Sequence, residues 1–152
     1  MKQKILVPHD GCEMSDKALG HAIAIAGAMR MEIIILRVVP PVIDGPAFAF
    51  LSEKERKRIK RERARINREV KTQIHDSLEK QLTRCTSEDV KASGRVIIGE
   101  PIEKILSVGG KEKPYLIVMG SRRLKGMAKL KVLGSVARKV SEEAKCPVTI
   151  VH

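Results

Sequence analysis

The sequence predicts an α/β fold: a doubly wound parallel sheet of five strands with helices on both faces. Short apolar runs rich in Ile and Val alternate along the chain with longer segments of helical periodicity, which is the order typical of such sheets. With 152 residues, 43% of them hydrophobic, the chain has the size of one compact domain. Since only 2% of the residues are aromatic, its core is predicted to be aliphatic.

Five short runs are predicted as strands, because they are apolar and rich in β-branched residues. The second is the clearest, since Ile and Val make up most of it. The third is predicted to be interrupted at Ser93 and Gly94. The five predicted strands cover residues 4–8, 32–39, 90–98, 115–119 and 148–151.

Four helices are predicted from apolar residues at helical spacing. In the first, Ser15 or a residue just before it is expected to cap the start, and Met29 to lie inward. In the third, Pro101 occupies the first turn and the pair Gly109-Gly110 is expected to end the helix. The predicted helices run over residues 14–30, 52–82, 101–108 and 135–145.

Much of the net charge of +12 lies in the second predicted helix, whose first half is nearly all Lys, Arg and Glu. Ser52 and Glu55 form a capping-box pattern at its start, and a narrow apolar stripe runs from Ile59 to Leu82. We interpret it as a surface helix with a solvated outer face and intrahelical ion pairs; a nucleic-acid-binding arm is the alternative. The mixed charges predict that any nucleic-acid binding is weak, falls with salt and is not specific for sequence.

The segment 42–51 contains Gly, Pro and both Phe residues. It is predicted to be a loop that either packs back on the body or forms an exposed apolar contact surface.

Three widely separated cysteines, without a CxxC pair, predict free thiols in a reducing compartment and no zinc site. Cys12, in a turn before a helix, is either a reactive thiol or a small packed side chain. The first residues read directly into a strand, and no apolar run is long enough to span a bilayer, so a cytoplasmic protein without membrane attachment is expected.

The stretch 118–136 indicates a binding site for an anion. An apolar run stops at Gly120, a glycine-rich basic loop follows, and a helical pattern begins at Gly134-Ser135. Unpaired N–H groups at a helix start suit a phosphate, although an ordinary strand-to-helix connection has the same elements. Ligands of doubly wound sheets bind at the carboxyl ends of the strands. Asp10 and Val38 lie at two such ends, and Asp10 either binds a ligand or caps its own turn.

No catalytic set of residues emerges. His21 and His75 are interpreted as structural or solvated, the adjacency of His9 and Asp10 in sequence says little about whether they face each other, and no serine has the setting of a nucleophile elbow. Enzymatic activity is therefore expected to be weak at most, because no general base can be named.

Several segments carry a family resemblance: KILVPHDGCEMSDKAL, IIILRVV, GEPIEKIL, VMGSRR and LGSVARKVSEEAKCPVTIV. Together they resemble the universal stress protein (UspA) family over essentially the whole chain, residues 1–152. The resemblance implies an adenine nucleotide alpha hydrolase-like sheet in the order 3-2-1-4-5. It also implies a homodimer, which we expect to form through the last strand because that strand lies at an edge.

One branch of the family binds ATP through Gly-x2-Gly-x9-Gly-Ser/Thr. Its first and third glycines and its hydroxyl match Gly120, Gly134 and Ser135. Arg123 stands at the second glycine, and ten residues rather than nine follow it, so this arginine either blocks the phosphates or supplies a cation to them. In the family, Cys12 is usually a serine. The nucleotide-binding residues that the resemblance implies are Asp10, Val38, Gly120, Arg122, Arg123, Gly134, Ser135 and Val136.

The function predicted is therefore that of a cytoplasmic, homodimeric stress-response protein that binds ATP or AMP. Mg²⁺ is expected only as a companion of ATP, and no metal site of the chain's own. The alternative is a nucleotide-free interaction module that acts through its dimer surface and its basic helix.

Overall fold

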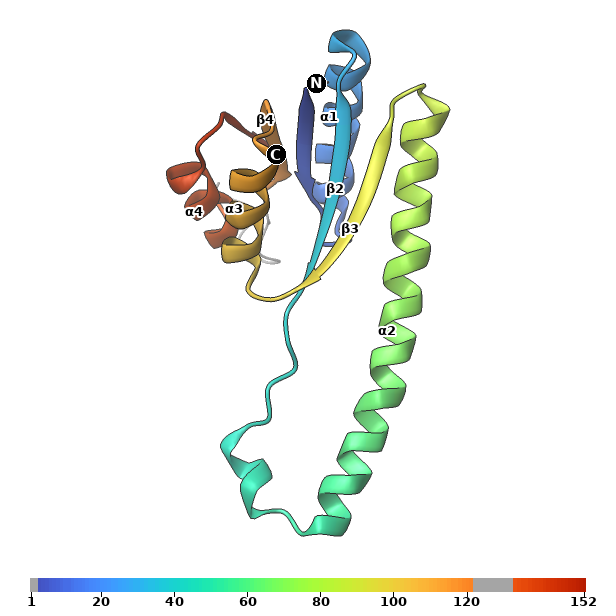
Figure 1. Ribbon diagram of the computed structural model, residues 1–152, viewed down its shortest axis with the longest axis vertical. Coiled ribbons are helices and arrows are strands. Elements are labelled where there is room, and N and C mark those ends of the chain that lie inside the picture. Colours follow the sequence, from blue (N-terminus) through green and yellow to red (C-terminus); the bar gives the residue numbers. More distant parts are fainter. Residues whose placement is uncertain (1–2, 122–132) are drawn as a thin grey trace.

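The computed structural model describes residues 3–121 and 133–152 and has the predicted α/β architecture (Figure 1). The sheet has five parallel strands in the order β3-β2-β1-β4-β5, as expected. The strands are β1 Lys4–Pro8, β2 Glu32–Val39, β3 Ala92–Ile98, β4 Leu116–Gly120 and β5 Val148–Val151. The helices are α1 Glu13–Met29, the 3₁₀ helix η1 Pro46–Phe50, α2 Glu53–Ser87, α3 Pro101–Glu112 and α4 Ser135–Glu143. No helix in the described ranges is both long and apolar enough to cross a bilayer.

Both faces of the sheet are covered by helices, and successive residues of the central strand β1 point to opposite faces. Ile5 and Val7 pack in a core that α1 and the end of α2 close. Leu6 packs in a second core with α3 and α4. All three side chains are fully buried, as expected for the middle strand of a parallel sheet.

The third strand is not interrupted, contrary to the prediction from Ser93 and Gly94. Both residues pair in register with β2, and the strand begins at Ala92 rather than Val90. A Cβ atom at Gly94 would lie 2.6 Å from the Leu78 Cδ2 atom. The glycine is therefore explained by the close packing of α2 on this strand and not by a break in it.

The third helix runs past Gly109-Gly110 to Glu112, so the predicted end was wrong. The Glu112 carboxylate pairs with Lys4 at 2.8 Å and with Arg95 at 2.7 Å. These contacts to two strands hold the last turn in place despite the low helix propensity of glycine. Lys113, the C-cap that follows Glu112, has a left-handed φ of 47° and ends the helix.

The ends of α1 also differ from the prediction. Its N-cap is Cys12, which makes no side-chain capping bond, and the Ser15 hydroxyl donates instead to the Asp10 carboxylate. At the other end Met29 is 48% exposed and not inward, because it is the last residue of the helix.

The first half of α2 and the loop before it project from the body as an arm, residues 40–70 (Figure 1). At 35 residues α2 is about 52 Å long, far longer than the sheet that it covers. Its buried residues, Leu78, Gln81 and Cys85, all lie in its last third. The predicted capping box of Ser52 and Glu55 is present. The loop forms an exposed apolar surface, one of the two predicted alternatives, with Phe50 90% exposed.

Gly120 is required by the packing of α1 on the sheet. A Cβ atom at this position would lie 2.6 Å from the backbone carbonyl carbon and oxygen of Met14. Since both contacts are to backbone, neither neighbour can move aside by changing a rotamer.

We predict that Gly120→Ala lowers the free energy of unfolding by about 1–3 kcal/mol, the usual cost of overpacking. The matched control is Gly110→Ala, because a Cβ there meets no atom within 4 Å and lies in a helix. That change should raise stability by about 0.5–1 kcal/mol. Urea denaturation of both variants checks the pair; equal stabilities would contradict the assigned contact.

Candidate functional site

A cavity of about 500 Å³ opens at the carboxyl ends of the strands. Its wall comes from β1, β2, β4, α1, α2, α3 and α4. Six of the predicted site residues line it: Asp10, Val38, Gly120, Gly134, Ser135 and Val136. Arg122 and Arg123 lie outside the described residues. The cavity has the size and mixed polarity of a small-molecule site.

Asp10 caps the turn between β1 and α1. Its Oδ1 atom accepts hydrogen bonds from the Cys12 backbone N–H, at 3.0 Å, and from the Ser15 hydroxyl, at 2.7 Å. Burial raises the pKa of this carboxyl, but the bonds from Cys12 and Ser15 outweigh burial and bring the pKa to about 2. Among the described residues no group donates to Oδ2, so a charged oxygen is left available on the cavity wall.

The first turn of α4 forms another part of the wall. Gly134 is its N-cap, in extended conformation and without a side chain to cap the helix, and the first turn has no acidic residue. The N–H groups that follow have no intrahelical acceptor. Because Gly134, Ser135 and Val136 line the cavity, these donors and the Ser135 hydroxyl are placed for an anion.

Apolar side chains form the opposite part of the wall. Val38 lies at the end of β2, beside Ile105 of α3 and Met119 of β4. These residues give an uncharged surface next to the polar groups of Asp10 and α4. A ligand with one apolar part and one anionic part suits this arrangement.

Sequence reasoning missed the part of the wall that α2 supplies. Val70, Gln73 and Ile74 line the cavity from a helix that was expected only to cover the sheet. Arg37 of β2 also lines the cavity. After Glu32 it is the one charged residue in an otherwise apolar strand, and this position near the end of the strand could have indicated a site residue. Its guanidinium covers Gly11, where a Cβ atom would lie 2.6 Å from Nη1 and φ is 87°.

His9 connects the turn, α1 and α2 beneath the cavity. Its Nδ1 accepts from the Gly11 backbone N–H at 3.1 Å and faces the Gln81 side-chain amide at 3.1 Å. Since an N–H donates to Nδ1, the proton of the neutral ring sits on Nε2, which donates to Asp16 Oδ1 at 2.9 Å. The His9 residue is 3% exposed, and its hydrogen bonds give it a structural role in this turn.

Burial lowers the pKa of His9 below 6.5, although the hydrogen bond and the charge of Asp16 oppose the shift. Between the folded and unfolded pKa values of His9 the unfolded chain binds more protons, so stability decreases as the pH is lowered through that window. We predict that the His9 contribution is complete above about pH 6.5 and declines below it.

Urea denaturation between about pH 7.5 and 5 measures this slope. His9→Asn is the matched control, because it keeps an acceptor near the Nδ1 position but cannot gain a proton. The slope should be smaller in that variant. The same slope in both proteins would assign the effect to other groups. Asp10 does not contribute in this range, since its pKa is about 2.

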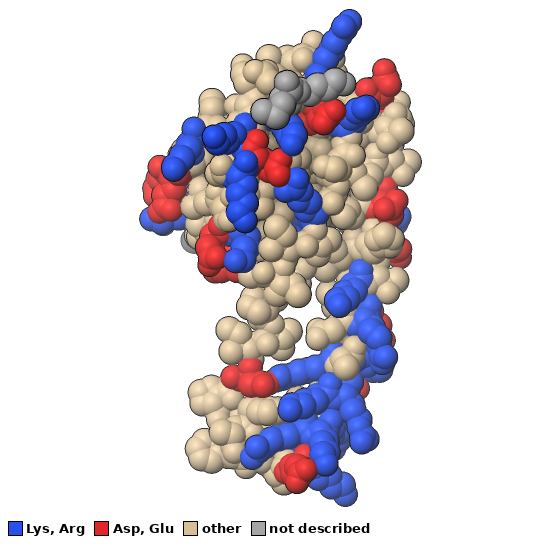
Figure 2. Space-filling model, in the orientation of Figure 1, with Lys and Arg blue, Asp and Glu red and all other residues tan. Residues whose placement is uncertain are grey.

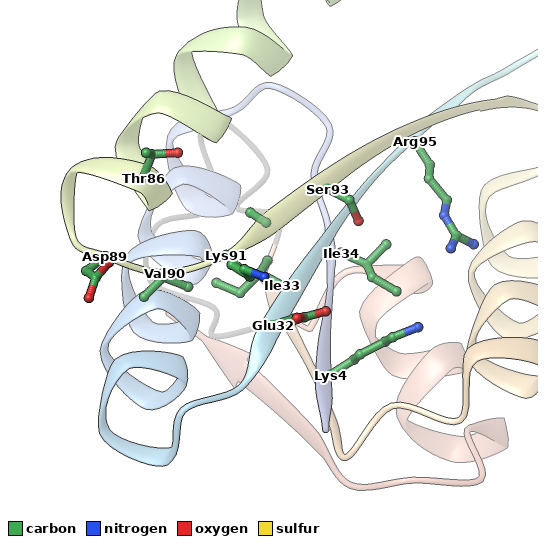
Figure 3. Close-up of a pocket in the computed structure, with 11 residues that line it drawn as sticks. Lys4, Glu32, Ile33, Ile34, Thr86, Asp89, Val90, Lys91, Ser93 and Arg95 are labelled. Carbon is green, nitrogen blue, oxygen red and sulfur yellow. The ribbon is translucent and has the colours of Figure 1, made fainter. Parts of the chain in front are cut away.

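A second cavity, of about 530 Å³, lies at the amino ends of the strands (Figure 3). Lys4, Glu32 and Arg95 line it, from the starts of β1 and β2 and from β3. Lys4 and Arg95 already share the Glu112 carboxylate. Because Lys4 and Arg95 are both paired and ligands of this fold class bind at the other edge, the first cavity is the candidate site.

The reactive side chains of the candidate site, Cys12, His9 and Asp10, are engaged in contacts with the protein itself. In the described part of the chain no group of three His, Cys, Asp or Glu side chains could hold a metal ion. The Cys12 Sγ atom lies 3.4 Å from the Ser15 hydroxyl, in a packed contact at the cavity wall. His9 and Asp10 already hold the turn, so the groups of this site are suited to binding.

Comparison with known proteins agrees with this architecture. The model of the universal stress protein family matches residues 1–152. Universal stress protein YxiE of Bacillus subtilis is 33% identical over 161 residues, covering 100% of both chains. Universal stress protein MJ0531 of Methanocaldococcus jannaschii is 31% identical over 154 residues, covering 98% of this chain and 81% of its own.

Solved structures show the same fold. UspA from Lactobacillus plantarum has a TM-score of 0.75 at 19% identity, covering 99% of this chain and 97% of its own. A universal stress protein in complex with cAMP has a TM-score of 0.67 at 23% identity, covering 99% and 96%. One from Archaeoglobus fulgidus in complex with dAMP has a TM-score of 0.66 at 14% identity, covering 100% and 98%. With the family model matching from end to end, the chain belongs to the universal stress protein family.

Proposed function

We propose that this protein is a stress-response protein that binds an adenine nucleotide, ATP or AMP, in the cavity at the carboxyl ends of the strands. The proposal rests on three features that line one cavity. They are the first turn of α4, which has no side-chain cap, the Oδ2 atom of Asp10, which accepts no hydrogen bond from the described residues, and the apolar side chains around Val38. The complexes of two related proteins with cAMP and dAMP support it.

In the proposed arrangement the phosphates meet the N–H groups at Gly134, Ser135 and Val136. Arg122 and Arg123, which lie outside the described residues, are proposed from the sequence alone to supply further positive charge. The adenosine part lies toward Asp10 and Val38, where the carboxylate accepts from an amino or hydroxyl group. Mg²⁺ accompanies ATP only, and the proposal is for binding, with no efficient hydrolysis.

We predict that Ser135→Ala weakens ATP binding by about 1.5–3 kcal/mol, or roughly 10- to 150-fold, because a hydrogen bond to a charged phosphate is lost. Isothermal titration calorimetry with ATP and AMP measures the change. Ser141→Ala is the matched control: its hydroxyl is on the same helix and donates to the Arg138 carbonyl at 2.7 Å, away from the cavity. Unchanged affinity in Ser135→Ala would contradict the phosphate position.

The same titration separates the two candidate functions. The nucleotide-free module is favoured by Arg123 and by the loop that is one residue longer than the nucleotide-binding motif. If titration of the protein with ATP and with AMP gives no more heat than titration with buffer, the protein does not bind these nucleotides. That result would favour the nucleotide-free module.

We also propose that the protein is a cytoplasmic homodimer that pairs through β5. Cys12, Cys85 and Cys146 are all free thiols, which suits a reducing compartment. β5 lies at the edge of the sheet. The Ile117 N–H donates to the Pro147 carbonyl at 3.0 Å and the Ser121 N–H to the Val151 carbonyl at 2.8 Å.

Odd-numbered residues of β5 therefore bond to β4, and the N–H and C=O groups of Val148 and Ile150 point to the free edge. A second copy related by a two-fold axis would satisfy these groups.

We predict that Ile150→Pro gives a folded monomer, because the lost N–H faces outward and Pro is tolerated on edge strands. Light scattering should show half the wild-type mass, with the circular dichroism spectrum preserved. Thr149→Pro is the matched control, since its N–H faces β4, and it should lose folded signal. Wild-type protein that is already monomeric at micromolar concentration would rule out the dimer.

A further inference from the structure

The arm is folded by contacts within itself and does not pack on the sheet. The Arg63 guanidinium lies 5.5 Å over the Phe48 ring and pairs with Asp44. Arg56 donates to the carbonyls of Leu51, at 2.8 Å, and Ala49, at 3.2 Å. A helix that only covers a sheet has no need of this length, so the outer part of α2 calls for another explanation.

These contacts fix how α2 is rotated in the arm. Arg56 and Arg63 are seven residues apart, two turns, and both reach the loop. The opposite side of the helix begins at residue 54 and continues along the helix at successive spacings of four, three, four and three residues. Its residues are Lys54, Arg58, Arg61, Arg65 and Arg68, all exposed. We call them the outer row; it spans about 21 Å.

The acidic residues of the arm leave most of this charge uncompensated. Glu55 is held in the capping box, and Glu62 pairs with Arg65 at 2.5 Å. Within the described residues, Lys54, Arg58, Arg61 and Arg68 make no ion pair. Figure 2 shows Lys and Arg side chains gathered along α2 in the projecting part of the molecule.

We propose that the outer row binds the phosphate backbone of double-stranded nucleic acid without sequence preference. A straight row of cations over about 21 Å matches a linear polyanion, and a duplex carries one charge per about 1.7 Å of its axis. The row contains no aromatic residue, so the stacking that favours single strands is missing. The net charge of +12 adds a long-range attraction.

Two other occupants fit the arm less well. A helix that lies on a membrane turns its apolar stripe toward the lipid. Here that stripe shares the side of Arg56 and Arg63. Although Ile66 and Val70 are exposed, the outer row lies on the opposite side and would face away from the lipid. A second copy of the chain would bring two outer rows of like charge together.

The test compares two variants that each remove four positive charges. The arm variant carries Lys54→Gln, Arg58→Gln, Arg61→Gln and Arg68→Gln; the control carries Lys80→Gln, Lys91→Gln, Lys111→Gln and Lys145→Gln, all exposed positions outside the arm. Gln keeps the helix propensity of the residues that it replaces. Fluorescence anisotropy is measured with two unrelated DNA duplexes, an RNA duplex and anionic vesicles of phosphatidylserine and phosphatidylcholine, over a range of salt.

The arm variant should bind every duplex at least about tenfold more weakly near 50 mM salt, and the slope of log K against log salt should fall by about 0.9 per lost DNA phosphate contact. The control should bind close to wild type, and both DNA sequences should bind equally. The DNA and RNA titrations show which duplex is preferred. Equal losses in the two variants, a preference for one DNA sequence, or vesicle binding without duplex binding would each overturn the proposal.

Discussion

The hydrogen bonds of the buried His9 ring join three parts of the molecule that also share the core on one face of the sheet. His9 directly follows β1, its Nε2 donates a hydrogen bond to Asp16 of α1, and the side-chain amide of Gln81 in α2 lies beside its other nitrogen. The same nitrogen holds the backbone of Gly11 and with it the turn that contains Asp10. These bonds hold the turn that contains Asp10 and tie α2 to it at Gln81. Both the turn and α2 line the candidate cavity.

Most of the fold could be predicted because a parallel sheet leaves a strong mark on its sequence. β2 was predicted to the residue, since its apolar run is bounded by Glu32 and by two prolines. The two errors at glycines share one cause. Gly94 and the pair Gly109-Gly110 suggested breaks, but their local propensity is outweighed by contacts from residues distant in the sequence, Leu78 in one case and Lys4 in the other.

The part of the candidate site that lies at the carboxyl ends of the strands could be predicted from the sequence. Asp10, Val38 and Gly134 come together because the carboxyl ends of parallel strands share an edge. Gln73 could not be foreseen, because periodicity identifies the apolar side of a helix without saying what faces it. Gly120 shows the opposite problem: it matches a phosphate-binding motif, yet the Met14 backbone alone is enough to require it.

α2 runs without Gly or Pro from the cavity wall to the end of the arm, so it moves as one rigid rod. Glu53 lies about 37 Å along the axis from Leu78, where the rod rests on β3. A tilt of about 5° at that support displaces the far end by about 3 Å, whereas Gln73, close to the support, moves by less than about 1 Å. Gln73 and Glu53 lie on the same side of that support, so the displacement from a small change in the packing at Leu78 would be small at the cavity and several times larger at the tip.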